Sequence, residues 1–271
     1  MIRILISLCL SASLFIACTK NALTGKNQLT LFSESDLQSM STQQYQQFLD
    51  SNKVVRAPSG NKDVDMVKRV GLRITQAAEA LLAEKGKAGF TKDYKWEYNL
   101  VDSKEVNAWC MPGGKIVVYT GLLPITQNEA ALAVVMGHEV CHALLQHGNQ
   151  RMSQQMGAEV VATGLQVALA NKPVETQNAY MAAFGLGSQV GVLLPFSRKQ
   201  ESQADEYGLY LAAMAGYNPQ EAIPLWERME KLGSSGQKPP EFLSTHPSEG
   251  KRIEDLKRIM PEALKRYKPM K

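Results

Sequence analysis

The stretch VVMGHEVCHALLQH, residues 134–147, contains three of the four histidines in this 271-residue chain. His138 and His142 are four residues apart, so on a helix both imidazoles point to one side, at a spacing that one ion can bridge. Zn²⁺ binds imidazole nitrogens at about 2.0–2.1 Å. Glu139 lies about 100° further round the helix, where its carboxylate can take a proton from metal-activated water. The motif predicts one zinc ion held by His138 and His142, with Glu139 as a general base.

The alternative for this stretch is a solvated helix that carries surface histidines. The apolar residues at 130–137 argue against it, because they predict a buried helix. Polar side chains on a buried helix are expected to have a functional role. Thr126 to Glu129 form a capping box that is expected to open this helix, which should run to about Gln150. His147 is nine residues from His138 and is therefore expected on the opposite face, at the surface.

A catalytic zinc site needs a third protein ligand and an open position. Glu201 and Asp205 share a helix face in the segment SRKQESQADE, residues 197–206. Glu201 could bind the metal while Asp205 accepts an imidazole N–H and fixes its tautomer. The spacing alone leaves open a second interpretation, in which both carboxylates belong to a charged solvated face.

The surrounding sequence predicts a mostly helical α+β domain with one small sheet. Tyr94–Val101 and Val106–Tyr119 are typical of two strands, and Pro112 cannot donate to a ladder, so the second should have a free edge. Apolar residues at helical period from Val64 predict a helix that ends at Gly86. Further helices are expected at 34–50, 152–170, 177–192, 198–215, 219–232 and 248–260.

Two further apolar runs, 158–170 and 181–196, are too short to span a membrane comfortably. We expect them to form core helices or a helical hairpin that covers the domain. The two cysteines outside the leader and its boundary, Cys110 and Cys141, are too few for a disulfide framework and are expected to be buried free thiols.

The first residues are typical of a secretion signal, with Arg3 followed by an apolar run from Ile4 to Ala17. The run ends at Cys18, as in bacterial lipoprotein signals, so Cys18 is the predicted lipid anchor. An ordinary signal peptide with an incidental cysteine is the alternative. The predicted organisation is a signal peptide at 1–17, a tether and strap at 18–60, and one catalytic domain at 61–271.

Three motifs together resemble one family. They are His138-Glu139-Val140-Cys141-His142, the later Glu201-x-x-x-Asp205, and the segment NAWCMPGG at 107–114. They resemble the minigluzincin zinc metallopeptidases of peptidase family M48, which includes the HtpX heat-shock protease and the CAAX prenyl endopeptidase. The exported lipoprotein branch typified by LoiP is most similar. The resemblance implies a zincin-like domain and a zinc ion held by His138, His142 and Glu201.

The resemblance also implies a place for substrate. The strand at 107–114 should lie above the zinc helix and pair through its edge with an extended peptide. The substrate-binding residues implied there are Asn107, Ala108, Trp109 and Gly113. His246, in STHPS at 244–248, is predicted as a catalytic donor that faces the developing oxyanion. A lone histidine in a loop is otherwise usually an exposed residue or part of a turn.

Composition narrows the possible functions of the protein. Thirty basic and 26 acidic residues give a net charge of +4, without the clustered basic surface of a nucleic-acid-binding protein. We expect a zinc metalloendopeptidase in the bacterial periplasm, anchored by lipid to a membrane, the outer in preference to the inner, and acting on unfolded envelope proteins. The alternatives are a chaperone-like binding protein with structural zinc and a metallohydrolase of cell-wall peptides. The oligomeric state is not predicted.

Overall fold

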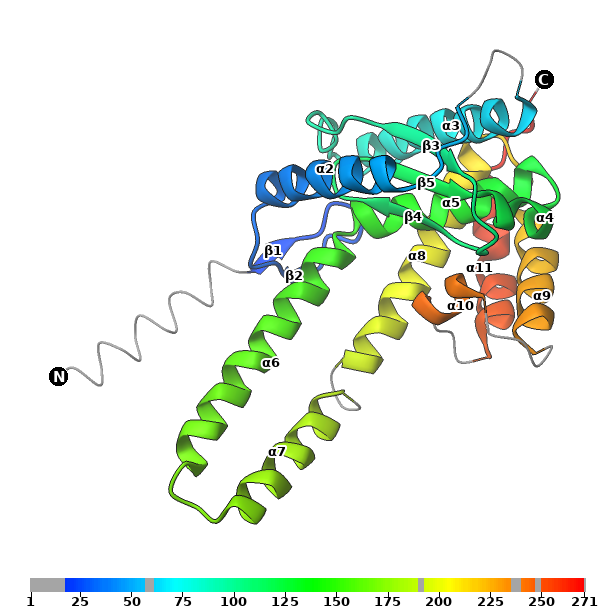
Figure 1. Ribbon diagram of the computed structural model, residues 1–271. Coiled ribbons are helices and arrows are strands. Elements are labelled where there is room, and N and C mark those ends of the chain that lie inside the picture. The colour runs from blue at the N-terminus through cyan, green and yellow to red at the C-terminus, as the bar shows by residue number, and fades with distance from the viewer. Residues whose placement is uncertain (1–17, 57–60, 190–192, 235–239, 247–249, 271) are drawn as a thin grey trace.

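The computed structural model of the chain describes residues 18–56, 61–189, 193–234, 240–246 and 250–270 (Figure 1). The predicted leader, residues 1–17, lies outside the described residues. The helices are α2 (Glu34–Ser51), α3 (Lys62–Glu84), α4 (Leu123–Thr126), α5 (Glu129–Leu144), α6 (His147–Leu169), α7 (Val174–Ser188), α8 (Leu194–Met214), α9 (Ala222–Gly233), α10 (Glu241–Thr245) and α11 (Arg252–Arg266). The prediction of a mostly helical α+β fold with a small sheet is confirmed.

The main sheet has three strands in the order β3-β5-β4, formed by Glu97–Val101, Lys115–Tyr119 and Ala108–Met111. β3 runs parallel to β5, and β4 runs antiparallel to it. The prediction of one strand over 106–119 is therefore wrong, because Pro112 lies in a turn that separates β4 from β5. Gly113 and Gly114 have φ values of 82° and 87°, which this turn requires and which other residues rarely adopt.

β4 is nevertheless the free edge that the sequence predicted. Among the described residues β4 pairs only with β5, so its other side carries unpaired backbone groups. β4 is also the strand that packs against α5. The edge of the sheet therefore lies above the helix that carries the histidine motif (Figure 1).

Helix α5 is buried along almost its entire length, between the sheet, α3 and α8. Its closest approach to α8 is at Gly137 and Gly208. A Cβ atom on Gly208 would lie 2.7 Å from the backbone nitrogen of His138, and one on Gly137 would lie 2.7 Å from the carbonyl oxygen of Gly208. Two glycines thus allow α8 to pass directly against the metal-binding motif.

Both predicted ends of this helix are wrong. Asn128 is the N-cap, and its side chain accepts from the amide of Ala131, because Gln127 adopts a left-handed conformation with φ of 65° and ends α4. The helix stops at Leu144, where the chain turns at Gln146, whose φ is 56°, and starts α6 in a new direction. Two non-glycine residues with positive φ are uncommon and do not show in a hydrophobic pattern.

The first residues that the structure describes form a strap. Its strands β1 (Cys18–Lys20) and β2 (Asn27–Leu29) pair as a short hairpin. The buried side chain of Asn21 donates to the carbonyl of Leu145 at 3.0 Å, and the buried amide of Gln150 donates to Gln28 at 2.9 Å. These bonds hold the hairpin to the corner between α5 and α6.

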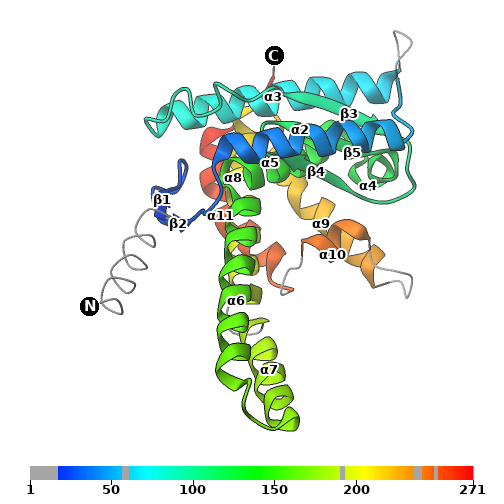
Figure 2. The same ribbon diagram turned by 60° about the vertical axis from the view of Figure 1, so that its left-hand side comes forward.

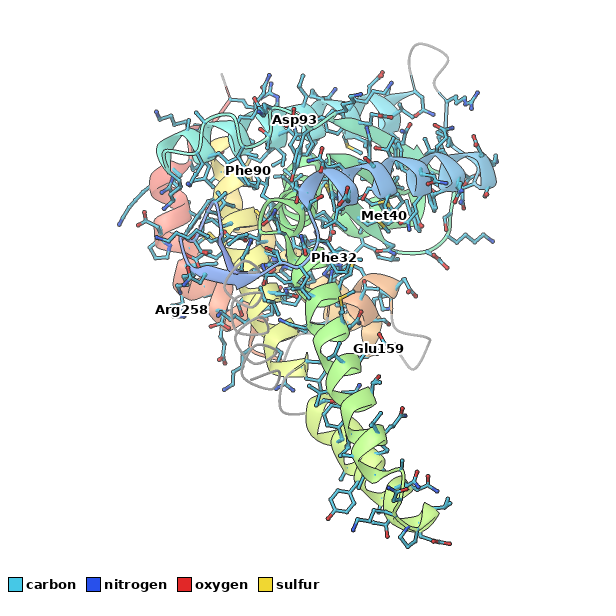
Figure 3. All side chains as sticks on the ribbon, turned by 90° about the vertical axis from the view of Figure 1, so that its left-hand side faces the viewer. Phe32, Met40, Phe90, Asp93, Glu159 and Arg258 are labelled. Carbon is cyan, nitrogen blue, oxygen red and sulfur yellow. The ribbon has the colours of Figure 1, made fainter. Side chains whose placement is uncertain are left out.

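Helices α6 and α7 form a hairpin that projects away from the rest of the molecule (Figures 1 and 2). Helix α7 has no buried residue. Figure 3 shows side chains standing out along α6, where Glu159 is labelled. The prediction that these helices cover the domain is therefore wrong. Within the described ranges, no helix has both the length and the apolar character needed to cross a membrane.

Candidate metal centre

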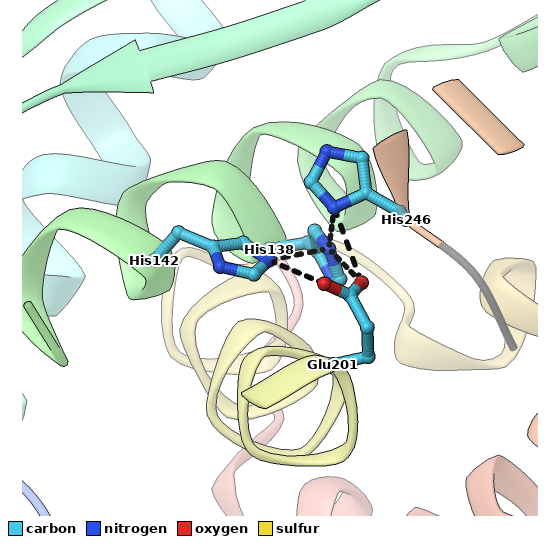
Figure 4. A group of neighbouring side chains, drawn as sticks. All are labelled: His138, His142, Glu201 and His246. Carbon is cyan, nitrogen blue, oxygen red and sulfur yellow. Dashed lines mark hydrogen bonds and ion pairs between the residues drawn. The ribbon is translucent and has the colours of Figure 1, made fainter. Parts of the chain in front are cut away.

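Four side chains from three parts of the chain point toward one another (Figure 4). His138 and His142 come from α5, Glu201 from α8, and His246 from the end of α10. One ligand atom from each lies within 4.8 Å of the others, and all four residues are buried. The Nε2 atoms of His138 and His142 are 3.0 Å apart. The sequence-predicted ligands are therefore brought together, with His246 as a fourth donor.

The donor set fits zinc. Imidazole nitrogens and a carboxylate oxygen are the ligands of catalytic zinc sites. Glu201 Oε2 lies 3.3 Å from His138 Nε2 and 3.1 Å from His246 Nδ1. Its Oε1 atom is buried and makes no hydrogen bond within the described part of the chain. A buried carboxylate oxygen without a donor, among converging nitrogen lone pairs, is stabilised by a cation.

The electrostatics of the cluster also favour a cation. Burial opposes ionisation of Glu201, but its contacts with the three imidazoles outweigh burial and hold its pKa below the usual range. Burial opposes protonation of His138, but hydrogen bonds to Asp205 and Glu201 raise its pKa to about 9. Burial lowers the pKa of His142 well below its ordinary value. The carboxylate therefore stays ionised, and a proton on His138 supplies positive charge in the absence of metal.

Glu139 lies next to this cluster and is buried. Its Oε1 is 3.4 Å from Nε2 of His246 and has no hydrogen-bond partner in the residues that the structure describes. Burial raises the pKa of Glu139, although the neighbouring imidazoles partly offset this effect. A carboxylate with a raised pKa and a free oxygen is suited to accept a proton.

Asp205 lies on the side of the His138 ring that faces away from the cluster. Its Oδ1 is 2.9 Å from Nδ1 of His138, so His138 donates there and keeps Nε2 for a metal. Burial opposes ionisation of Asp205, but the Arg252 charge and the His138 hydrogen bond lower its pKa below the usual value.

Arg252 is a functional residue that sequence analysis missed. Its guanidinium donates to Asp205 Oδ1 at 2.6 Å, lies 3.8 Å from Glu201 and stacks on the ring of Trp226. It also donates to the backbone carbonyl of His246 at 3.4 Å. No sequence pattern links Arg252 to Asp205, because the contact depends on how α11 packs against α8.

His147 does not lie at the surface, and that prediction is wrong. Its side chain is fully buried, and its Nδ1 is 2.9 Å from Nδ1 of His142. The expected position assumed one helix through residue 150, whereas the left-handed turn at Gln146 directs His147 back towards the motif. The only sequence signal was Gly148, two residues after the polar Gln146, which is compatible with a helix break.

The predicted substrate-binding residues lie at or beside β4. The backbone amide of Ala108 bonds to the Asn107 side chain at 2.9 Å, and Ala108 itself packs in the main core. The indole of Trp109 instead packs on Phe48 of α2, with ring centroids 4.9 Å apart. Gly113 lies in the β4–β5 turn. The Trp109 side chain therefore points away from the metal centre, and its backbone alone belongs to the edge.

Cys110 and Cys141 are both free thiols, as predicted, but the prediction that both are buried is wrong for Cys110. Cys141 is fully buried in α5, and Cys110 on β4 is partly exposed. Burial raises the pKa of both thiols well above the ordinary value, so both stay protonated at neutral pH.

The family comparison agrees with this geometry. The family model described as "Peptidase family M48" matches residues 72–260, a span that includes all four donors and Arg252. The chain belongs to peptidase family M48. This confirms the family to which the sequence motifs pointed and, with the donor set, identifies the metal as zinc.

Relatives within family M48 cover much of the chain. It is 32% identical over 215 residues to Mitochondrial metalloendopeptidase OMA1 of Schizosaccharomyces pombe, which is 79% of this chain and 60% of that relative. It is 39% identical over 175 residues to the OMA1 of Arabidopsis thaliana, covering 64% of this chain and 34% of the relative. It is 28% identical over 165 residues to the Beta-barrel assembly-enhancing protease of Escherichia coli, covering 60% of this chain and 34% of the relative. The chain thus spans between about a third and three fifths of the length of these relatives.

Proposed function

We propose that this protein is a zinc-dependent metalloendopeptidase. The observation that carries the proposal is the free, buried carboxylate oxygen of Glu139 beside the group formed by His138, His142 and Glu201. Bound zinc supplies a Lewis acid that polarises a carbonyl and lowers the pKa of water towards about 7. Glu139 then accepts the proton of the attacking water and can pass it to the leaving amine.

The edge of β4 supports a polypeptide substrate. An extended peptide can add to the unpaired side of this strand through backbone hydrogen bonds, which require no particular sequence. A folded domain does not present such a segment, so unfolded or locally open chains are the proposed substrates. The partly buried Ala108–Met111 strand sets the peptide above α5, with its scissile bond over the metal centre.

The proposed setting is the bacterial envelope, with lipid attached to Cys18. The support is the leader sequence, in which one arginine and an apolar run precede a cysteine. A relative that is 28% identical over 165 residues bears the name Beta-barrel assembly-enhancing protease in Escherichia coli. Cys18→Ala is expected to abolish labelling by a radioactive fatty acid and release the protein from membranes. An unchanged membrane fraction in this variant would place the anchor elsewhere.

One observation favours a second function. His246 adds a fourth protein donor, and four protein donors are typical of structural zinc sites. A chaperone-like protein with structural or weakly active zinc would hold unfolded chains at the same strand edge without cleaving them. Cleavage with turnover separates this function from the first.

The deciding experiment compares Glu139→Gln with the parent protein on unfolded casein, with and without a chelator. Because glutamine removes the base and no ligand, we expect bound zinc to remain stoichiometric while cleavage is lost. Glu227→Gln, an exposed position on α9, is the matched control and should cleave like the parent. Full cleavage by the zinc-loaded Glu139→Gln variant would refute the mechanism.

A further inference from the structure

His147 is the first residue of α6, yet its ring lies inside the molecule between α5 and α8. Nδ1 is 2.9 Å from Nδ1 of His142, and Nε2 is 3.3 Å from Oε1 of Gln203. No exposed surface remains on His147. Its two ring nitrogens therefore connect one metal ligand to one amide on the helix that carries Glu201.

The local backbone fixes this position. The left-handed conformation of Gln146 turns the chain at the end of α5 and aims the next side chain inwards. The amide of Gln200 then lies 3.4 Å from the carbonyl of His147, and His147 stacks edge-on to His142 with ring centroids 4.8 Å apart. The ring is thus held by its backbone and by both neighbouring helices.

The contacts determine where each proton lies. Nε2 of His142 faces the metal cluster, 3.0 Å from His138 Nε2 and 3.5 Å from Glu201 Oε1, so it must be free of hydrogen to bind a metal. Its proton is then on Nδ1 and is donated to Nδ1 of His147. His147 carries its own proton on Nε2 and donates it to the amide oxygen of Gln203. Each ring nitrogen of His142 and His147 then has a complementary partner.

The opposite assignment breaks two contacts. A proton on Nδ1 of His147 would force the His142 proton onto Nε2, where it blocks metal binding. With the Gln203 amide oriented as in the structure, it would also leave the Nε2 lone pair of His147 facing the lone pairs of the Gln203 oxygen. Such unmatched buried groups cost about 1–3 kcal/mol each, so a single tautomer is favoured.

We propose that His147 is a positioning residue that fixes His142 in the Nδ1–H tautomer and so presents Nε2 to zinc. This inference rests on the proposed zinc centre. It gives the two histidine ligands different partners, since His138 donates to the carboxylate of Asp205 and His142 to a neutral imidazole. The neutral partner orients His142 without adding a further negative charge beside Glu201 and Glu139.

The first test measures zinc affinity by competition with a chromophoric chelator. His147→Leu removes the acceptor and is expected to weaken zinc binding by roughly 10- to 100-fold, the usual effect of losing such a partner. His147→Asn is the rescue variant, because its Oδ1 stands where Nδ1 stood and can accept from His142. We expect this variant to recover most of the affinity. Equal affinity in parent and His147→Leu, or no difference between Leu and Asn, would overturn the inference.

The second test needs no substitution. Nitrogen-15 spectra of labelled histidines in the parent protein report which ring nitrogen carries the proton. We expect Nδ1–H on His142 and Nε2–H on His147 when zinc is bound, and the opposite pattern would overturn the inference. A parent protein that binds no zinc would instead contradict the proposed function, so the two failures are distinguishable.

Discussion

At the scale of single residues, Arg252 allows two carboxylates to lie side by side in a buried site. Asp205 and Glu201 are 2.6 Å and 3.8 Å from the same guanidinium nitrogen. The side chain of Arg252 is only 2% exposed, so water does little to screen these charges. The C-terminal helix therefore supplies the charge that balances the acidic residues of α8.

Arg252→Met tests this role. The substitution removes the arginine from the buried carboxylate of Asp205 and leaves His138 as its remaining partner, and it removes the stacking on Trp226. Breaking a buried pair in this way costs about 3–5 kcal/mol, which denaturant unfolding of the metal-free protein would measure. Arg258→Met on the same helix is the control, because its pair with Asp255 is exposed, and its effect should stay below about 1 kcal/mol. Equal effects of both substitutions would contradict the role of Arg252.

His246 lies between the metal ligands and Glu139. Its Nδ1 faces Glu201, and its Nε2 is 3.4 Å from the carboxylate of Glu139. We expect His246→Ala to retain zinc on the three other donors and to lower kcat by roughly 10²–10³, the loss typical of one oxyanion donor. Loss of zinc in this variant would make His246 a required ligand. A rise in kcat would show that the imidazole occupies the place of the attacking water.

At the scale of the elements, the crossing of α5 and α8 sets the geometry of the centre. Gly137 and Gly208 let the two backbones touch, which brings Glu201 and Asp205 within reach of His138. The contacts at this crossing are with backbone atoms, which cannot rotate away. The two helices can therefore come this close only because neither glycine carries a side chain.

Gly208→Ala is expected to force the helices apart. Overpacking of this kind costs about 1–3 kcal/mol, and zinc affinity should fall as Glu201 moves away from the histidines. Gly164→Ala on α6 is the control, since a Cβ there meets nothing within 4 Å. This control should instead stabilise its helix by up to about 1 kcal/mol. Unfolding curves and chelator competition on both variants check the prediction, and an unchanged zinc affinity for Gly208→Ala would contradict it.

The parts that the sequence could predict are those with a local pattern. His138 and His142 follow from helical spacing, whereas Glu201 needed the family resemblance, because a lone carboxylate pair also fits a solvated surface. The positive φ values at Gln127 and Gln146 set the two ends of α5, and no sequence pattern indicated them. The turn at Gln146 is the reason that the predicted position of His147 was wrong. Arg252 could not be predicted, because its partners lie on elements that are distant in sequence.

At the scale of the whole molecule, the α6–α7 hairpin differs from the rest of the fold. Of the thirteen large apolar side chains that are exposed in the described chain, seven lie in this hairpin, between Met156 and Leu186. Helix α7 buries nothing, whereas α5 buries nearly every residue. The hairpin therefore gains little stability from tertiary packing, which supplies most of the stability of helices in proteins.

Amide hydrogen exchange should report this difference. We expect amides between Val160 and Leu186 to exchange on the order of 10²-fold faster than those of α5, because opening the hairpin exposes little buried surface. Mass spectrometry of peptides from each region measures both rates in one sample. Equal protection in the two regions would show that the hairpin unfolds only together with the body.

The strap has a mechanical consequence. If Cys18 carries the proposed lipid, a pull on this anchor passes along β1 to Asn21, whose amide is bonded to the carbonyl of Leu145 directly after α5. The load thus reaches the end of the helix that carries His138 and His142, a few residues from His142 itself. Tension on the anchor is borne first by a three-residue strand pair and a few side-chain amides. The proposed attachment at Cys18 would therefore load a hydrogen bond at the end of the helix that carries two of the metal-binding histidines.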